Sequence, residues 1–479
     1  MKNITFQNNY FELPIPEGGF KEGQKVLFMG FLRGVTGGYN ENEEGNFVFN
    51  PNDNNTNTNV FANNFGFFLD IVKKGAKLFV LSTAPTNRHF WSVMNNDIFK
   101  FVKSNFQSRT KYLSYIKRHM CTDRITGKEE DIPRLNKLAK KGMKFDYIIQ
   151  NPPYDGSLHL DFFKAGLDLL SENGKMVIIE PATWLINVRK NGKAKKYDEI
   201  KKRIEGHVES VVIENLNKDF GTGLQLPFAI TTIDMSKTFD TIDLVVCGGH
   251  QTVKSIYDCN LIGDYATIWG ILDKCQKFGD MMKNHITKEA KGESMWYAKY
   301  AEIVGNIGCG VMVDRPTHTA VKYESPFNWP QDNENVYGAY FDSGYATKFN
   351  KITDSPVKAV KSGSKKGVLG DNNADCVYGT RQELENWKHF IFNNKLPLFL
   401  NIVLTIDQHN NSKDFLPWLV DKQYTDEEIN QMFGFTDEEV ALIDRTIKKY
   451  ERNSPWFRRY MCGPASVSDE EVNNYLKAI

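Results

Sequence analysis

Four consecutive residues, Asn151-Pro152-Pro153-Tyr154, combine the groups that chemistry on a planar amine requires. Neither proline has an N–H for a sheet, and each disfavours helix in the residue before it, so the sequence predicts a stiff, extended turn. The side-chain oxygen of Asn151 and the carbonyl of Pro152 are two acceptors in a fixed geometry, and Tyr154 adds an aromatic face. Two such acceptors can bind both hydrogens of an amino group and make its nitrogen a better nucleophile. A turn with a purely structural role is the alternative interpretation.

The segments on either side of this turn predict the elements that position it. Residues 145–150 form a short, apolar, β-branched run that is typical of a buried parallel strand. Open α/β sheets bind their ligands at the carboxyl ends of such strands. A helix is expected from His159 to Leu170, ended by a cap at Asn173-Gly174, and residues 175–179 predict a second buried strand.

The rest of the first half alternates between helical and strand patterns. Strands are predicted at 77–81, 208–213 and 229–233, and helices at 61–72, 90–101 and 132–141. This alternation is typical of an α/β fold with a mostly parallel sheet. Near the C-terminus, Thr425 and Thr436 each stand three residues before a glutamate and predict two helix-starting capping boxes.

Composition limits the class of protein. A chain of 479 residues with 41% hydrophobic residues predicts more than one core. Seven scattered cysteines without a CxxC pair argue against a zinc site or a disulfide framework, so no metal is expected. The N-terminal residues lack the apolar core of a signal peptide, and no apolar run reaches membrane-spanning length, so we expect a cytoplasmic protein without a membrane partner. Because the net charge is only +1, a polyanion would have to bind a local basic patch.

The decapeptide at 145–154, FDYIIQNPPY, resembles motif IV of the amino-methyltransferases that use S-adenosylmethionine, whose strand reads FDxIIxNPPY. The order of the elements around it is similar to motifs IV through VI and to the gamma arrangement of adenine-N6 DNA methyltransferases in bacterial and phage restriction–modification systems. The resemblance implies a Rossmann-like methyltransferase domain that methylates N6 of a flipped adenine in double-stranded DNA. It assigns the catalytic role to Asn151, Pro152, Pro153 and Tyr154.

The resemblance also implies a cofactor site at the carboxyl edge of the sheet, beside a glycine-rich loop after the first strand. The best-placed candidate loop begins at Ser82, but residues 82–87 contain neither a glycine nor an acid. The glycine-rich stretch at 33–38 lies more than a hundred residues before Asn151. Asp123 resembles the acid that contacts the adenine of the cofactor. We therefore expect Ser82, Asp123 and Asn151 to contact S-adenosylmethionine, with weak binding because the loop lacks glycine.

Candidate DNA contacts follow the catalytic turn. Phe220 stands in a Phe-Gly-Thr-Gly loop where the family often carries an aromatic residue that stacks on the extruded base. Further candidates are lysines on two basic stretches, namely Lys193, Lys195, Lys196, Lys365 and Lys366. A packed phenylalanine and solvated surface lysines are the alternative interpretations.

Four regions are expected: an N-terminal region of unclear role (1–58), the catalytic domain (59–240), a mixed α+β target-recognition region (241–390) and a helical C-terminal region (391–479). The resemblance implies a monomer that acts on DNA, with a restriction endonuclease as a further partner. Three other functions stay open. They are methylation of glutamine in a protein, methylation of an RNA base, and DNA binding by a relative that has lost catalysis.

Overall fold

The computed structural model describes the secondary elements of two units and parts of the segments between them. The described residues are 6–7, 10–11, 19–30, 38–41, 47–50, 75–82, 120–124, 127–154, 156–188, 194–217, 227–281, 284, 313–314, 319–320, 336–342, 374–406, 409–410, 415–451 and 453–479. One unit comprises residues 1–185, 190–259 and 455–478, and the other comprises 186–189, 260–454 and 479. The expected helices at 61–72 and 90–101 lie outside the described residues.

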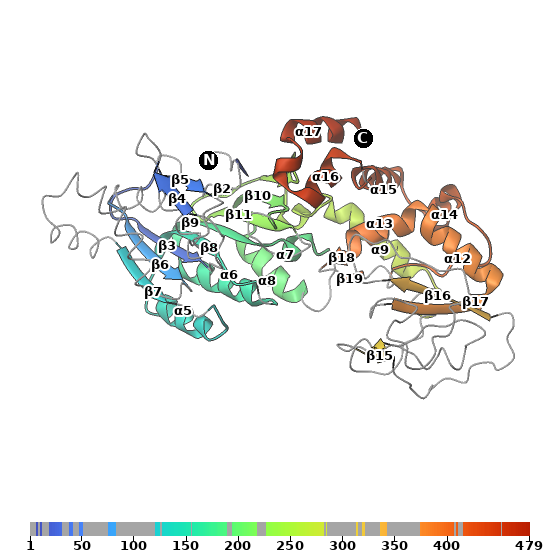
Figure 1. The fold of residues 1–479 in the computed structure, drawn as a ribbon, viewed down its shortest axis with the longest axis horizontal. Helices are drawn as coiled ribbons and strands as arrows, with labels where there is room; N and C mark the ends of the chain where they lie inside the picture. The colour runs from blue at the N-terminus through green and yellow to red at the C-terminus, as the bar shows by residue number, and fades with distance from the viewer. Residues whose placement is uncertain are drawn as a thin grey trace, which may run out of the picture. The chain divides into compact units, whose positions relative to one another are not determined.

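The first unit is built on a nine-stranded sheet (Figure 1). Its order from one edge to the other is β13-β12-β10-β11-β9-β8-β3-β6-β7. The strands are β3 (Lys25–Gly30), β6 (Lys77–Ser82), β7 (Met120–Arg124), β8 (Phe145–Asn151), β9 (Leu170–Pro181), β10 (Val208–Glu214), β11 (Phe228–Asp234), β12 (Ile242–Val246) and β13 (Gly249–Val253). From β7 to β9 all neighbours pair in parallel, whereas β11 pairs antiparallel with both β9 and β10.

This strand order confirms the predicted α/β, Rossmann-like fold. Counted along the chain from β3, the sheet runs 3-2-1-4-5, which is the order of doubly wound folds, and then continues with an antiparallel pair. The sequence suggested that the loop beginning at Ser82 follows the first strand of the sheet, and this expectation is wrong. Counted along the chain, β3 is the first strand of the sheet and β6, which ends at Ser82, is the second. Local sequence patterns identify strands but not their neighbours, so the position of β3 beside β8 was not apparent from them.

Helices cover the central strands, and their boundaries follow from local packing. Helix α6 (Leu158–Leu169) lies against β8 and β9, flanked by α5 (Asp131–Lys140) and α8 (Ala194–Ile204), as Figure 1 shows. Gly166 permits this approach, because a Cβ there would come within 2.5 Å of the side-chain oxygen of Gln150. The predicted cap at Asn173-Gly174 is wrong, since α6 ends at Leu169 and both residues belong to β9.

The last residues of the chain return to the first unit. Helices α16 (Pro455–Cys462) and α17 (Asp469–Ala478), joined by the short helix η3 (Pro464–Ser466), pack beside β13. The buried indole of Trp456 donates to the carbonyl of Val246 at 2.9 Å. The catalytic domain expected at 59–240 is therefore narrower than this unit, which also includes β3, β12, β13 and the C-terminal helices.

The second unit has its own core, formed by helices that include α9 (Tyr265–Lys277), α12 (Arg381–Asn393), α13 (Lys395–Leu404), α14 (Asp426–Phe433) and α15 (Asp437–Lys449). Trp387, Phe399 and Trp418 belong to this core. Both predicted capping boxes are confirmed, with Thr425 and Thr436 as the N-caps of α14 and α15. β16 (Val336–Asp342) and β17 (Ala374–Thr380) form an antiparallel pair.

The remaining elements are short. They are β1 (Phe6–Gln7), β2 (Tyr10–Phe11), β4 (Gly38–Glu41), β5 (Phe47–Asn50), α7 (Thr183–Ile186), η1 (Ile256–Asp258), β14 (Val313–Asp314), β15 (Thr319–Ala320), β18 (Thr405–Ile406) and β19 (His409–Asn410). No helix of the described part of the chain is long and apolar enough to cross a membrane.

Candidate active site

The candidate site lies where the strand order of the sheet reverses, between β3 and β8. In open α/β sheets, ligands bind outside the carboxyl ends of the strands at this point. Gly30, the last residue of β3, pairs with Asn151 on one side and with Ser82 on the other. Because neighbouring strands are about 4.8 Å apart, the backbones of these three residues lie within roughly 10 Å of one another. The structure thus places two predicted site residues in one row at the edge of the sheet.

The turn after β8 directs Tyr154 back over the end of the sheet. The hydroxyl of Tyr154 donates a hydrogen bond to the side-chain oxygen of Asn151 and also lies 3.3 Å from the carbonyl oxygen of Ile179 on β9. The ring of Tyr154 meets that of Phe228 edge to face, with the centroids 5.4 Å apart. Asn151 is 8% exposed and Pro152 is buried, so the turn presents its polar groups from a packed base.

Burial determines the ionisation of the groups at this end of the sheet. Burial, and secondly the charge of Glu180, raise the pKa of the Tyr154 phenol well above its ordinary value, so the hydroxyl keeps its proton. Burial also raises the pKa of Glu180 well above its usual range, against an opposing effect of the Trp184 indole. A carboxyl group in such an environment is neutral over a wider pH range than an exposed one.

Glu180 and Phe228 were not among the predicted site residues. The signal for Glu180 was its position at the end of a buried strand directly before a proline. Phe228 lies between Pro227 and the strand predicted at 229–233, and nothing in its sequence context distinguishes it from an ordinary core residue. Gly30 was also missed, although a glycine at the end of an apolar strand is a recognisable feature of a close backbone approach.

The predicted cofactor residues lie on three strands of one sheet, β8, β6 and β7, and β3 stands between β8 and β6. Asp123 lies on β7 opposite Leu81, one position before the pair formed by Arg124 and Ser82. It therefore belongs to a strand and not to a loop after one. The residues that follow Gly30 in the sequence include the glycines of the 33–38 stretch, so a glycine-containing segment follows the strand beside β8. The reason for expecting weak cofactor binding, a loop without glycine, applied to the second strand and no longer holds.

Lys196 and, further along α8, Lys201 have partners within the protein. Lys196 forms an ion pair with Asp161 at 2.8 Å and lies 3.3 Å from the hydroxyl of Ser157. Lys201 is 2% exposed, and burial lowers its pKa to about 8. Lys195 lies on α8, and the structure describes its backbone alone.

Four predicted DNA contacts lie outside the described residues, namely Lys193, Phe220, Lys365 and Lys366. Their roles therefore stay predictions. No cluster of potential metal ligands occurs within the described residues.

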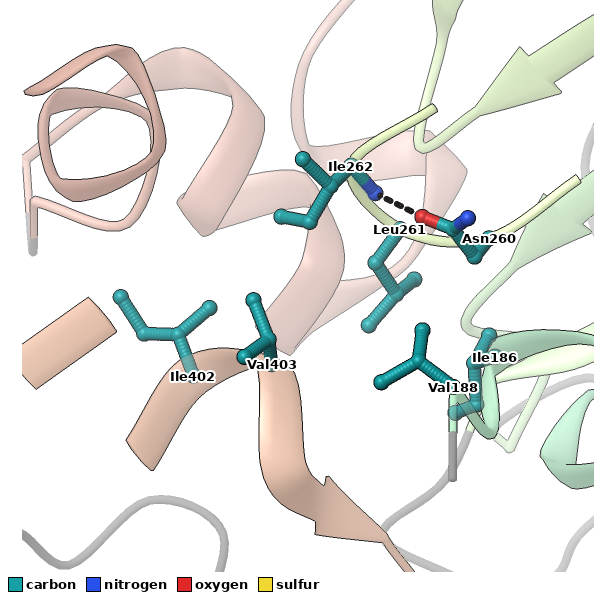
Figure 2. Close-up of a pocket in the computed structure, with 7 residues that line it drawn as sticks. All are labelled: Ile186, Val188, Asn260, Leu261, Ile262, Ile402 and Val403. Carbon is teal, nitrogen blue, oxygen red and sulfur yellow. Dashed lines mark hydrogen bonds between the residues drawn. The ribbon is translucent and has the colours of Figure 1, made fainter. Parts of the chain in front are cut away.

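A small hollow in the second unit has a different character (Figure 2). Its lining is apolar except for Asn260, whose side-chain oxygen accepts from the backbone N–H groups of Ile262 and Gly263. Because this amide stabilises a local turn and no titratable side chain lines the hollow, we do not assign the chemistry to it.

Part of this chain is similar to parts of several solved structures. A structure described as a modification subunit of a type I restriction enzyme from Vibrio vulnificus matches with 12% identity and a TM-score of 0.29, over 47% of this chain and 43% of that one. A type I restriction-modification methyltransferase subunit from Streptococcus thermophilus matches with 12% identity and a TM-score of 0.27, over 48% of this chain and 43% of that one. A methyltransferase complexed with SAH matches with 14% identity and a TM-score of 0.23, over 45% and 46%.

The chain spans less than half the length of these structures. No family model and no curated protein matches the sequence. The assignment of the fold therefore depends on the strand order of the sheet.

Proposed function

We propose that this protein is an S-adenosylmethionine-dependent methyltransferase that methylates N6 of adenine in DNA. The observation that carries the proposal is the position of Asn151. It ends the strand beside the first strand of a Rossmann-like sheet, in one row with Gly30 and Ser82, and begins an Asn-Pro-Pro-Tyr turn. The two acceptors for the substrate amine would then lie close to the edge of the sheet at which the cofactor would bind.

The residues of the site fit the cofactor. Gly30 has no side chain to obstruct a ligand at the edge of the sheet, and Asp123 belongs to β7 of the same sheet. S-adenosylmethionine, when bound, supplies an electrophilic methyl group. The side-chain oxygen of Asn151 and the carbonyl of Pro152 would each accept one hydrogen of the adenine amino group, which keeps the nitrogen lone pair available. In the transfer, that nitrogen would form a bond to the methyl carbon while the bond between this carbon and the cofactor sulfur breaks. S-adenosylhomocysteine would leave, and the nitrogen would release one proton to solvent.

A nucleic-acid base would reach this turn only outside the double helix. Extruding a base costs roughly a few kcal/mol, which stacking on an aromatic side chain partly offsets. Tyr154 stands beside Asn151 and is suited to that contact. We assign the recognition of a DNA sequence to the second unit, which has a separate core of residues such as Trp387 and Phe399.

The test uses the full-length protein with S-adenosylmethionine labelled in the methyl group. Duplex DNA, total RNA and a protein extract are offered in parallel, and the products are digested and separated. We expect label in N6-methyladenine from DNA, and none with Asn151→Ala. Label in glutamine or in an RNA base would replace the DNA proposal with that substrate class.

Cofactor binding is tested separately by calorimetry, with and without DNA. We expect a dissociation constant in the micromolar range, which corresponds to about −8 kcal/mol at 1 μM. Absence of any binding heat, together with absence of label from every substrate, would favour a DNA-binding relative without catalysis.

A further inference from the structure

The hydroxyl of Tyr154 has one proton and two acceptors. It donates to the side-chain oxygen of Asn151, and the carbonyl oxygen of Ile179 lies 3.3 Å away. A backbone carbonyl only accepts hydrogen bonds, so one phenol proton cannot serve both oxygens fully. Because the pKa of Tyr154 is raised by burial, the hydroxyl does not ionise to relieve this competition.

The amide nitrogen of Asn151 has hydrogens to donate but no acceptor among the described residues. This nitrogen carries two hydrogens, and it makes no hydrogen bond to any residue that the structure describes. A turn of the amide by 180° exchanges its oxygen and nitrogen. The nitrogen then donates to the hydroxyl oxygen of Tyr154, and the hydroxyl donates to Ile179. Both bonds have one donor and one acceptor, and the amide oxygen is released from Tyr154.

We infer that Tyr154 is a positioning residue whose hydroxyl, held by the carbonyl of Ile179, orients the Asn151 amide for reaction. The inference rests on the proposed function. In the arrangement with Tyr154 donating to Asn151, the amide oxygen is already a partner of the hydroxyl and is a poorer acceptor for a substrate amine. In the turned arrangement the amide oxygen faces the substrate, while the chain from Asn151 through Tyr154 to Ile179 fixes its direction.

The geometry gives this chain a rigid support. The carbonyl of Ile179 belongs to β9, whose neighbours β8 and β11 hold it on both sides. The edge-to-face contact with Phe228 on β11 holds the ring of Tyr154 in the same region. The hydroxyl therefore has a separate task from the ring. The ring offers a face on which a base can stack. The hydroxyl links the carbonyl of Ile179 to the amide of Asn151 and so fixes the orientation of that amide.

The activity test separates these two tasks. Tyr154→Phe retains the ring and removes the hydroxyl. As a matched control, Tyr147→Phe removes a buried phenol hydroxyl from β8, the strand that precedes the turn. We expect Tyr154→Phe to lower the single-turnover rate of methyl transfer about three- to tenfold, with unchanged affinities for DNA and cofactor. In the Asn151→Ala background, the same change should have no further effect. Equal effects in both backgrounds, or a wild-type rate for Tyr154→Phe, would overturn the inference.

A second measurement does not depend on activity. Solvent exchange of the Asn151 side-chain amide is followed by NMR in protein labelled with 15N-asparagine, and Asn151→Asp identifies the signal. We expect one amide hydrogen to be protected in the wild type and to lose that protection in Tyr154→Phe. Equal exchange in the two proteins would contradict the orienting contact. If the wild-type protein methylates no substrate, the proposed function fails, and this exchange measurement still decides the role of the hydroxyl.

Discussion

At the scale of single residues, the site joins a reactive turn to a group of buried polar side chains. Asn151 and Tyr154 are close enough to share a hydrogen bond, and Glu180 is fully buried on the neighbouring strand. Buried polar groups cost free energy unless they have partners, so such a group at the end of a sheet is a candidate for function. Substitutions of Asn151 and Glu180 distinguish the residue proposed to be catalytic from one that is only buried.

We expect Asn151→Ala to reduce methyl transfer by about 10²–10³-fold, because it removes a preorganised acceptor for the substrate amine. Cofactor affinity should be nearly unchanged, since the backbone of the strand end is retained. Single-turnover kinetics and calorimetry measure the two quantities. A rate close to that of the wild type would mean that the turn is only structural.

Glu180→Gln tests the effect of burial on stability. Because the pKa of Glu180 is raised in the folded protein, the folded chain keeps a proton that the unfolded chain loses above about pH 4.5. The free energy of unfolding therefore falls as the pH rises through that window, by about 1.4 kcal/mol for each tenfold difference in proton affinity.

Glutamine cannot ionise, so this loss should be absent in the variant. We expect Glu180→Gln to be more stable than the wild type at pH 7 and equally stable near pH 4. Urea unfolding at both pH values checks the prediction. A constant difference between the two proteins at all pH values would show that the pKa of Glu180 is the same in the folded and unfolded chains.

At the scale of elements, a buried ion pair connects α16 to the sheet. Arg459 is 4% exposed and donates to Glu214 on β10, to Asp469 and to the carbonyl of Val467. Gly248 makes room for it, because a Cβ there would come within 2.5 Å of the guanidinium. The carboxylate of Glu214 is 0% exposed. A charge can be buried to this extent when it is paired, and here Arg459 supplies the opposite charge.

Arg459→Met should destabilise the protein by about 3–5 kcal/mol, because it leaves Glu214 buried without its cation. The neighbouring Arg458 provides a matched control, since its ion pair with Glu471 is about half exposed. Arg458→Met should cost at most about 1 kcal/mol. Thermal unfolding of the two variants measures the difference, and similar midpoints would contradict the structural role of the buried pair. Replacing Glu214 by Gln in the Arg459→Met background should recover part of the loss.

The sequence predicted individual elements better than their arrangement. The apolar runs at 145–150 and 208–213 and the capping boxes at Thr425 and Thr436 have local causes, and the structure confirms them. The end of α6 was misplaced, because Asn173-Gly174 has the composition of a cap but lies within a long strand. Neither the position of β3 beside β8 nor the pairing of Arg459 with Glu214 has a local signal. Both depend on contacts between residues far apart in the chain.

At the scale of the whole molecule, the chain leaves the first unit and returns to it. Residues 186–189 and 260–454 belong to the second unit, and residues 455–478 complete the first. The candidate active site and its sheet therefore depend on helices that follow the entire second unit in the sequence. The regions expected at 59–240 and 391–479 do not coincide with these two units.

Removal of residues 455–479 should therefore damage the first unit although its active-site turn is intact. We expect a lower unfolding temperature than for Arg459→Met, because the truncation also exposes the apolar surface beneath Trp456. A synthetic peptide of residues 455–479 should raise that temperature in proportion to the logarithm of its concentration once binding is saturating. An unchanged unfolding temperature after truncation would show that these helices are dispensable.

The late position of Arg459 also has a consequence for synthesis on the ribosome. Glu214 is made 245 residues before the arginine that neutralises it. At about 5–20 residues per second, the nascent chain waits on the order of tens of seconds for that partner. A prematurely terminated product that contains all of the Asn151–Tyr154 turn would still lack the residues that complete the first unit. The first unit can therefore be completed only after the whole of the second unit has been translated.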